Sequence, residues 1–380
     1  MNTYLCEMIN EIIVKNPQFI VNPNYEDLLF KQLITNDLFK NYDKQQYMNE
    51  IKDILKHINK ERCCNSYEYS NLDINEQTKT QIHILQNTPQ PMQKTPEWYT
   101  FRHEHITASN AWKAFGTQAV KNQLIYEKCK ALQSAINETM MDTSNNEMIP
   151  VYKTSTSNLS ESSLTWGHKY EPLTRMLYED KHKTIIQDFG CIEHPIHTFL
   201  AASPDGIVVG ENNYGRMIEI KNVVSREINQ IPKIDYYIQT QLQMEVCDLD
   251  ECDFIETKFT EYENYNDYIQ DNTDDKKGII VVYVNNGAYE YYYMPFHIKE
   301  EKEINEWLDN NMNNSGEWIK NVYWKLSVYS CVLIKRQREW FTYAIPHLIE
   351  IWNTILVERT GDYSDRAPRK RNKVTNNINI

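Results

Sequence analysis

Two short segments, Ser203-Pro-Asp-Gly-Ile-Val-Val209 and Met217-Ile-Glu-Ile-Lys-Asn222, decide the fold of this 380-residue chain. Both are β-rich runs, and turn residues open the first and separate it from the second. Side chains two positions apart on a strand point to the same face, so we expect Glu219 and Lys221 to lie together. The chain contains four other Glu-x-Lys sequences, but apolar residues bracket this one, which indicates a largely buried strand.

Asp205, Glu219 and Lys221 have the composition of a site that hydrolyses phosphodiesters. Hard divalent cations such as Mg²⁺ bind carboxylate oxygens together with a backbone carbonyl, here that of Ile220, and keep several waters. A lysine beside such an ion can orient or deprotonate a water and stabilise charge at phosphorus. The alternative, a hairpin with an ion pair at a sheet edge, stays open from these two segments alone, because such turns are common.

Other parts of the chain add side chains suited to the same chemistry. Arg102 stands shortly before a Thr-Ala-Ser sequence that is typical of a helix start, and both Arg102 and Ser109 suit a terminal phosphate. Glu171 lies on a predicted helix that can face the sheet, and Gln239 and Gln243 share one helix face. Each residue alone has an ordinary surface explanation, but their joint order favours one site.

The core is predicted to span residues 95–298 and to belong to the α/β class. The change from helical to strand-like period predicts a mixed central sheet flanked by helices, in which the helix after the third strand supplies a crossover. A Ser/Thr/Asn/Met-rich stretch, 137–163, is interpreted as a mobile loop. The expected helices are 107–135, 164–180 and 234–246, and the expected strands are 185–192, 199–209, 216–223, 253–259, 278–284 and 288–294.

Extensions are predicted on both sides of this core. Residues 1–90 have apolar positions at helical spacing and are interpreted as a helical accessory region, which a Pro-punctuated stretch, 87–96, separates from the core. Residues 299–365, which contain five tryptophans, are predicted to be a helical extension, and 366–380 a basic, disordered tail.

Composition excludes several classes of protein. The 41% hydrophobic content argues against a disordered chain, and no window has the roughly 18 apolar residues of a membrane helix. The beginning of the chain does not read as a secretory signal, and eight scattered cysteines without a CxxC pair indicate a reducing, intracellular location without structural zinc. A net charge of -13 disfavours a protein that coats nucleic acid with its whole surface.

At these residues the sequence resembles the phage-lambda exonuclease and YqaJ-like viral recombinase family of the PD-(D/E)xK nuclease superfamily. The resemblance covers roughly residues 95–295 and implies a restriction-endonuclease-like core. It rests on Trp98 with Arg102, Thr107-Ala-Ser109, Gly167 with Glu171-Pro172, Ser203-Pro-Asp205-Gly206, Glu219-Ile-Lys221 and Tyr237-Ile-Gln239-Thr-Gln241.

The resemblance also implies a role for each candidate residue. Asp205 and Glu219 would bind a catalytic Mg²⁺, which Mn²⁺ can replace, with the carbonyl of Ile220 and with Glu171 as an additional carboxylate. Lys221 would act on the attacking water. Further residues would hold the 5′ phosphate and support the network: Arg102 and Ser109 for the phosphate, Ser203 and Gln239 for the network.

The implied activity is 5′ to 3′ digestion of one strand of duplex DNA, which leaves a 3′ single strand for an annealing protein in recombination, replication or repair. Long extensions at both ends depart from the compact phage enzyme, so its ring-shaped trimer is not assumed, and a homo-oligomer stays open. Two rivals remain: a structure-specific or nicking endonuclease on the same core, and a non-catalytic DNA-binding module.

A DNA substrate requires basic residues along its path despite the net charge of -13. Candidates lie on the first core helix and in two later clusters, the second of which also resembles a nuclear-localisation signal. They are Lys113, Lys121, Lys128, Lys130, Lys335-Arg-Gln-Arg338 and Arg366-Ala-Pro-Arg-Lys-Arg-Asn-Lys373. If the protein is viral, the host cytoplasm, the replication site or the nucleus would be its location.

Overall fold

A computed structural model describes most of the chain after residue 75 and several shorter stretches before it. The described ranges are 3–15, 25–35, 45, 48–51, 53–54, 63–65, 75–132, 163–230, 232–273, 276–285, 288–311 and 316–368. The predicted loop at 137–163 and the tail after 368 therefore lie almost entirely outside the described residues. Within the described ranges, no helix has the length and apolar character needed to cross a membrane.

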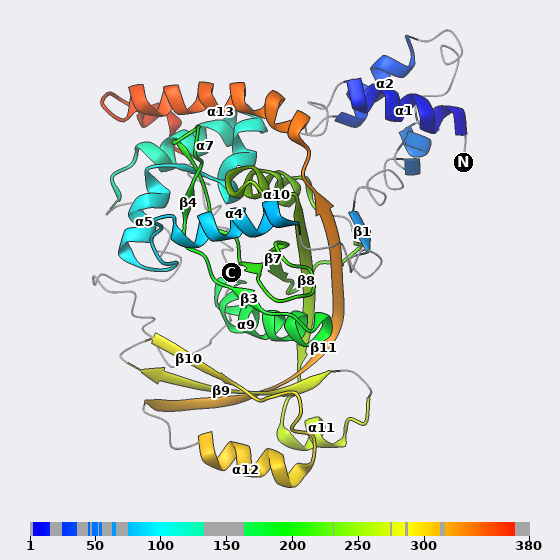
Figure 1. Ribbon diagram of the computed structural model, residues 1–380, viewed down its shortest axis with the longest axis vertical. Helices are drawn as coiled ribbons and strands as arrows, with labels where there is room; N and C mark the ends of the chain where they lie inside the picture. Colours follow the sequence, from blue (N-terminus) through cyan, green and yellow to red (C-terminus); the bar gives the residue numbers. More distant parts are fainter. Residues whose placement is uncertain are drawn as a thin grey trace, which may run out of the picture.

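The central sheet is mixed and runs through most of the height of the molecule (Figure 1). Its strand order is β10-β9-β11-β8-β7-β6-β3, and β1 pairs with β11. The strands are β1 (Cys63–Asn65), β3 (Ile186–Gln187), β6 (Gly206–Val208), β7 (Met217–Asn222), β8 (Glu251–Glu261), β9 (Lys277–Asn285), β10 (Ala288–Tyr293) and β11 (Glu317–Lys335). The predicted α/β class with a mixed central sheet is confirmed.

Strand β7 lies inside the sheet, between β6 and β8. It pairs antiparallel with β6 and parallel with β8, and a parallel pair requires a crossover. Helix α10 (Ile234–Cys247) supplies that crossover, as the sequence predicted, and ends at Asp248 in the left-handed region with φ 49°. Because β7 is an interior strand, the alternative of an ion pair at a sheet edge is wrong.

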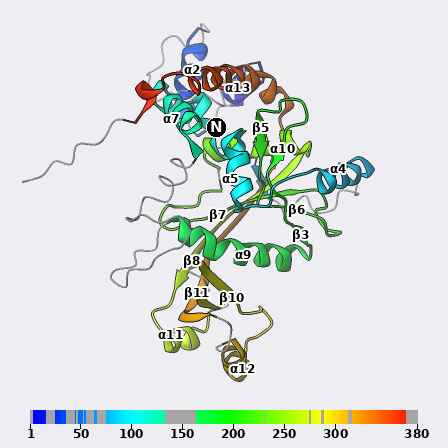
Figure 2. The ribbon, with the colours of Figure 1, turned by 90° about the vertical axis from the view of Figure 1, so that its left-hand side faces the viewer.

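Helices α10 and α9 (Ser163–His182) cover opposite faces of β7 (Figure 2). On one face, Met217 packs in the cluster that contains Leu242 of α10. On the other, Ile218 and Ile220 pack with Tyr178 of α9. The alternation of β7 therefore directs Glu219 and Lys221 toward α10.

The predicted helix 107–135 is interrupted. Ile106–Thr107 form strand β2 of a small sheet with β5 (Leu200–Ala202) and β4 (Ile192–Glu193). Helix α6 (Ala108–Ala111), a 3₁₀ turn at Trp112–Phe115 and helix α7 (Gln118–Cys129) follow. The break comes at Gly116, which is extended rather than helical. In the same way, the single strand expected at 185–192 is two strands in different sheets.

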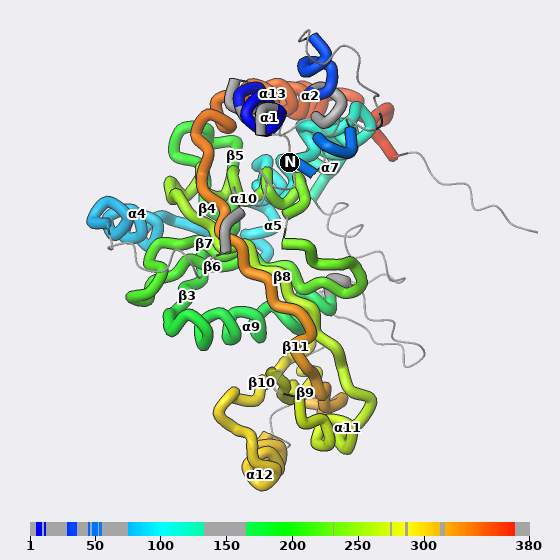
Figure 3. The backbone as a smooth tube through the Cα atoms, turned by 90° about the vertical axis from the view of Figure 1, so that its right-hand side faces the viewer, coloured from blue at the N-terminus to red at the C-terminus, as the bar shows by residue number. Residues whose placement is uncertain are grey.

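The prediction of a helix through Trp318 and Trp324 is wrong, because residues 317–335 form the long strand β11. Val322 and Trp324 are buried while their neighbours are more exposed, which is the two-residue period of a strand. The helical interpretation relied on the tryptophans and overlooked this alternation. Strand β11 pairs with β8 along one half and with β9 along the other, and so joins the core to a distal lobe of β9, β10, α11 (Tyr265–Gln270) and α12 (Glu301–Asn311) (Figure 3).

Four more helices flank these sheets, and α5 (Pro96–His103) lies beside the site described below. Helices α1 (Thr3–Lys15) and α2 (Tyr25–Leu33) pack against each other at the N-terminal side. Helix α4 (Glu76–Asn87) begins at Asn75, whose side chain accepts a hydrogen bond from the Gln77 amide. Helix α13 (Arg338–Glu358) lies across the top of the core, above α7 and α10 (Figure 1).

Candidate active site

The hairpin of β6 and β7 positions the first carboxylate. The amide of Asp205 donates to the carbonyl of Ile218 at 3.1 Å, and the Oδ2 atom of Asp205 accepts from the Ile220 amide at 2.7 Å. Gly206 is required by packing: a Cβ there would lie 2.2 Å from Cγ2 of Ile186. The Pro-Asp-Gly sequence thus allows β3 to approach closely, and this fixes the direction of Asp205.

The second carboxylate, Glu219, is buried at 1% exposure and is held by three side chains. Lys221 forms an ion pair with its Oε1 atom, as the two-residue spacing predicted. Gln239 donates to Oε1 at 2.8 Å, and Gln243 donates to Oε2 at 2.7 Å. The four-residue spacing of Gln239 and Gln243 predicts that they share one helix face, and that spacing is the signal for the contact of Gln243 with the carboxylate.

The surroundings of Asp205 disfavour its charged form. Burial, followed by the charges of Glu219 and Glu171, raises the pKa of Asp205 well above its ordinary value. Burial lowers the pKa of Lys221, but the charges of Glu219 and Asp205 outweigh it and raise the pKa above the ordinary value. Negative charge is therefore in excess here, and Lys221 is held as an ammonium ion.

Glu171 lies at a cleft of about 390 Å³ at the end of β7. Its Oε1 atom is 3.9 Å from Nζ of Lys94, and its side chain is 29% exposed. The cleft is lined by Gly167, Glu171, Ile220, Lys221, Asn222, Val223, Val224, Ser225, Arg226, Lys233 and Tyr236. The structure thus brings Glu171 and Lys221 to one opening.

The Pro-punctuated stretch, predicted as a boundary, also contributes to the site. Gln93 donates to the carbonyls of Phe189 and Pro204, at 2.8 and 3.0 Å, and so holds the residue before Asp205. A Cβ at Gly190 would lie 2.2 Å from the Pro91 carbonyl oxygen, which shows how closely the stretch packs. Sequence reasoning missed this contribution, and Gly190 was its only local signal.

The side chains of Arg102 and Ser109 contact each other beside the hairpin that carries Asp205. Arg102 is near the end of helix α5 (Pro96–His103) and donates to Oγ of Ser109 at 2.9 Å. Its guanidinium lies 4.2 Å from the ring centroid of Trp98, whose Nε1 donates to Oγ of Ser203 at 3.0 Å. Ser203 is two residues from Asp205, so a short chain of contacts joins the two sides.

Burial lowers the pKa of Arg102, while the charges of Cys191, Tyr99, Glu219 and Asp205 act to raise it. The predicted site residues thus come together around the hairpin: Asp205, Glu219, Lys221, Glu171 and Gln239 on one side and Arg102, Ser109 and Ser203 on the other.

Several basic residues predicted along a DNA path are not available for it. Lys128 is 6% exposed, and the side chain of Arg336 is 4% exposed and ion-paired with Glu245. Lys113 is paired with Glu127. Lys128 and Arg336 are therefore too buried for the predicted DNA contact, whereas for Lys113 the contact stays a prediction.

The donor set fits a hard divalent cation. Among the residues that the structure describes, no three His, Cys, Asp or Glu side chains are gathered tightly enough to form a ready metal-binding group. Two carboxylates nevertheless meet at the hairpin, and the raised pKa of Asp205 indicates negative charge that lacks compensation.

Residues 97–250 match the family model of the YqaJ-like viral recombinase domain. The resemblance inferred from the sequence is confirmed for this part of the chain. An uncharacterized protein, R354, of Acanthamoeba polyphaga mimivirus is 27% identical over 337 residues, which cover 76% of this chain and 57% of the relative. The chain therefore spans little more than half the length of that relative.

Two solved structures are similar to this chain at low sequence identity. An alkaline exonuclease from Laribacter hongkongensis is 18% identical, with a TM-score of 0.40, and the match covers 70% of this chain and 95% of that one. A phage-related exonuclease from Haemophilus somnus 129PT is 12% identical, with a TM-score of 0.36, over 69% of this chain and 99% of that one.

Proposed function

We propose that the protein is a divalent-metal-dependent deoxyribonuclease that digests duplex DNA from 5′ ends. The observation that carries the proposal is the convergence of Asp205, Glu219 and Lys221 within a YqaJ-like domain, next to Arg102. Carboxylates and an amine suit phosphodiester hydrolysis, and a guanidinium suits a terminal phosphate. Neither group alone would specify an exonuclease.

Asp205 and Glu219 would hold the cation, together with the carbonyl of Ile220 and with Glu171 at the cleft. Mg²⁺ suits these oxygen donors, and Mn²⁺ would replace it. When bound, the ion would stabilise charge on the scissile phosphate and make a water more acidic. Gln239 and Gln243 would keep Glu219 in place throughout, since each binds one of its oxygens.

Lys221 would change partners in the reaction. It is bound to Glu219, and its pKa is raised mainly by the neighbouring carboxylates, against the effect of burial. Compensation of those carboxylates would release the amine toward the cleft and lower its pKa. Lys221 would then give up one proton to solvent, orient the attacking water and accept a proton from it, while the 3′ oxygen of the terminal nucleotide leaves and takes up a proton from solvent.

Arg102 would set the polarity of digestion by binding the 5′ phosphate, with Ser109 as a second donor and Ser203 supporting them through Trp98. The expected products are 5′ mononucleotides and a 3′ single-stranded tail. Such a tail is a substrate for an annealing protein, so recombination, replication or repair inside a host cell is the setting we infer.

Digestion of a linear duplex labelled at either end, with Mg²⁺ or with a chelator, tests the proposal. Metal-dependent release of nucleotides from the 5′ end supports it. Cleavage of a closed circle would instead identify an endonuclease, and binding without cleavage would identify a DNA-binding module. Lys221→Ala should lower turnover by roughly 10² to 10⁴ while leaving DNA binding nearly intact; an active Lys221→Ala enzyme would remove Lys221 from the mechanism.

A further inference from the structure

The end of helix α5, which carries Arg102, is held by cations from two distant elements. The last carbonyls of a helix have no partner within the helix. Nζ of Lys128, on α7, donates to the Arg102 carbonyl at 2.6 Å. The guanidinium of Arg359, at the C-terminal end of α13, donates to the His103 carbonyl at 2.9 Å. The backbone of Arg102 is therefore fixed by side chains outside its own helix.

Arg359 also joins the two elements to each other. Its Nε atom donates to the Lys128 carbonyl at 2.8 Å, and its guanidinium lies 5.2 Å from the ring centroid of Trp352. The ring of His103 donates in turn to the Lys130 carbonyl at 2.8 Å. One guanidinium thus binds the ends of both α5 and α7, in a geometry that the point charge of a lysine cannot reproduce.

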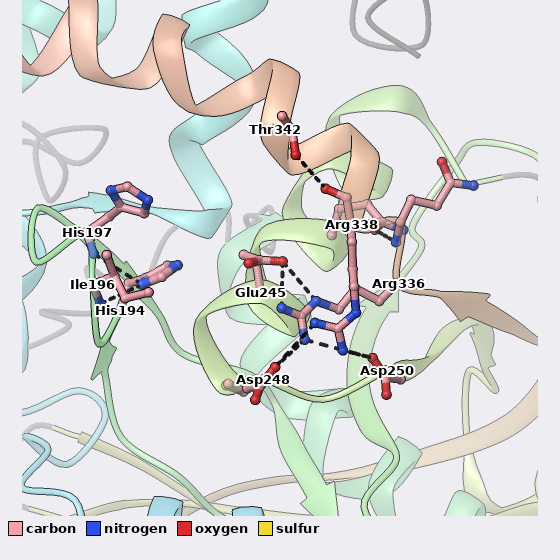
Figure 4. A network of polar contacts seen from close by, with 12 residues as sticks. His194, Ile196, His197, Glu245, Asp248, Asp250, Arg336, Arg338 and Thr342 are labelled. Atoms are coloured by element: carbon pink, nitrogen blue, oxygen red, sulfur yellow. Dashed lines mark hydrogen bonds and ion pairs between the residues drawn. The ribbon is translucent and has the colours of Figure 1, made fainter. Parts of the chain in front are cut away.

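The opposite end of α13 is anchored to the carboxylate side of the site (Figure 4). Arg336, just before the helix, donates to Glu245 at 2.8 Å and to Asp248 at 2.5 Å, at the end of α10. Helix α10 carries Gln239 and Gln243, which hold Glu219. Helix α13 therefore spans from the element that supports the carboxylates to the one that carries Arg102.

The cluster at the Arg359 end has an excess of positive charge. Within the described ranges, no carboxylate is within ion-pair distance of Arg102, Lys128 or Arg359. Burial, with Arg102 as the next cause, lowers the pKa of Lys128 to about 7. Carboxylates act on these cations only from beyond ion-pair distance, Glu127 on Lys128 and Glu104 on Arg359, so an anion bound among them would stabilise their charged forms.

We propose that Arg359 and Lys128 are positioning residues, which hold Arg102 in the orientation that binds the terminal 5′ phosphate. Helix α13 thereby makes the choice of DNA end depend on a segment outside the YqaJ-like domain, which ends at residue 250. This inference rests on the proposed function. A merely structural Arg359 would instead weaken the whole fold and slow digestion of every end equally.

The test compares duplexes with 5′-phosphate and 5′-hydroxyl ends. In Arg359→Met, the ratio of kcat/KM for the two ends should fall about tenfold, mainly through KM for the phosphorylated end, with kcat on hydroxyl ends unchanged. Lys128→Met should lower the ratio in the same direction. Arg175→Met, which removes an arginine paired with exposed Asp188, is the control and should leave the ratio unchanged.

Arg359→Lys keeps the charge but loses the second hydrogen bond, so it should restore only part of the preference for 5′-phosphorylated ends. If Arg359→Met does not fold, Arg359→Lys replaces it in the comparison. An unchanged ratio in a folded Arg359 variant, or equal losses on both ends, would overturn the proposal. Equilibrium binding of the two duplexes in a chelator measures the same preference without turnover. An inactive wild type that still prefers phosphorylated ends would sink the proposed function alone, whereas an active wild type with an indifferent Arg359→Met would sink this inference alone.

Discussion

Two buried lysines of the same domain have opposite electrostatic surroundings. Lys221 lies among carboxylates, and its pKa is raised although burial lowers it. Lys128 lies beside Arg102 and Arg359. Burial, followed by the charge of Arg102, lowers the pKa of Lys128 to about 7. Because burial acts in the same direction on both, the neighbours decide the outcome.

This difference indicates what each side of the site lacks. On the carboxylate side, burial and the charges of Glu219 and Glu171 disfavour the charged form of Asp205, which a cation would stabilise. On the Arg102 side, burial and the charge of Arg102 disfavour the charged form of Lys128, which a phosphate would stabilise. Trp98 and Ser203 connect the two sides. A DNA end bound across both would place its 5′ phosphate at the Arg102 side and its scissile phosphate beside the cation of the carboxylate side.

Asp205→Asn should have the largest effect. We expect a loss of activity of roughly 10³ or more, because the cation loses a ligand. The same change should raise the free energy of unfolding in a chelator at pH 7. The pKa of Asp205 is raised on folding, so its charged form destabilises the native state above the ordinary pKa, and a neutral amide removes that penalty.

Thermal unfolding and nucleotide release measure the two effects of Asp205→Asn. Asp253→Asn is the matched control, since Asp253 is buried but paired with Arg216; this variant should be less stable than the wild type. An Asp205→Asn protein that loses activity and stability together would show that Asp205 supports the fold and would remove the charge comparison.

Arg102→Met should have the second-largest effect, and only on substrates with 5′-phosphorylated ends. We expect the preference for 5′-phosphorylated over 5′-hydroxyl ends to fall about 10- to 100-fold, because charge-assisted hydrogen bonds to the phosphate are lost. Competition between the two ends in one digestion measures it. Arg175→Met, which removes an arginine paired with exposed Asp188, should not change the preference. Equal loss on both ends would remove Arg102 from end recognition.

The two sides also differ in how far the sequence could predict them. Asp205, just before β6, lies within 17 residues of Glu219 and Lys221 on β7, and the two-residue period of a strand was enough to place the last two together. The crossover by α10 followed from helix periodicity in the same way. Local patterns therefore predicted the carboxylate side and the interior of the core.

The Arg102 side depends on contacts that no local pattern carries. His103 and Arg359 are 256 positions apart, and their hydrogen bond exists only because β11 returns the chain to the core before α13 begins. The sequence interpretation treated 299–365 as helical throughout and Lys128 as an exposed DNA contact. Both errors have one cause: burial of a strand or a lysine by distant elements is decided by tertiary packing.

Gln243→Met should lower kcat about tenfold on both kinds of end. The change removes the donor to Oε2 of Glu219 while keeping the volume of the side chain, so the carboxylate loses one of its fixed hydrogen bonds. Gln241→Met is the control: Gln241 is equally buried on the same helix but donates to the Lys335 carbonyl. A preference for one end in Gln243→Met, or an equal loss in Gln241→Met, would contradict this assignment to the carboxylate side.

Lys128→Met should have the smallest effect on turnover and a clear effect on how stability depends on pH. The pKa of Lys128 is about 7 in the folded protein and 10.5 at its ordinary value, so the unfolded chain binds more protons between these limits. The wild type should therefore gain stability relative to Lys128→Met as the pH rises from 7 to 10, by a few kcal/mol. Below pH 7 the difference should be constant, because the lysine is then charged in both states.

Urea unfolding of both proteins at pH 6, 7, 8 and 9 measures this difference, with Lys121→Met on the same helix as a control for the loss of a lysine. Parallel stability curves for wild type and Lys128→Met would mean that Lys128 does not titrate in this range. The charged form of Lys128 would then not be destabilised by its surroundings, and the electrostatic contrast between Lys128 and Lys221 would not hold.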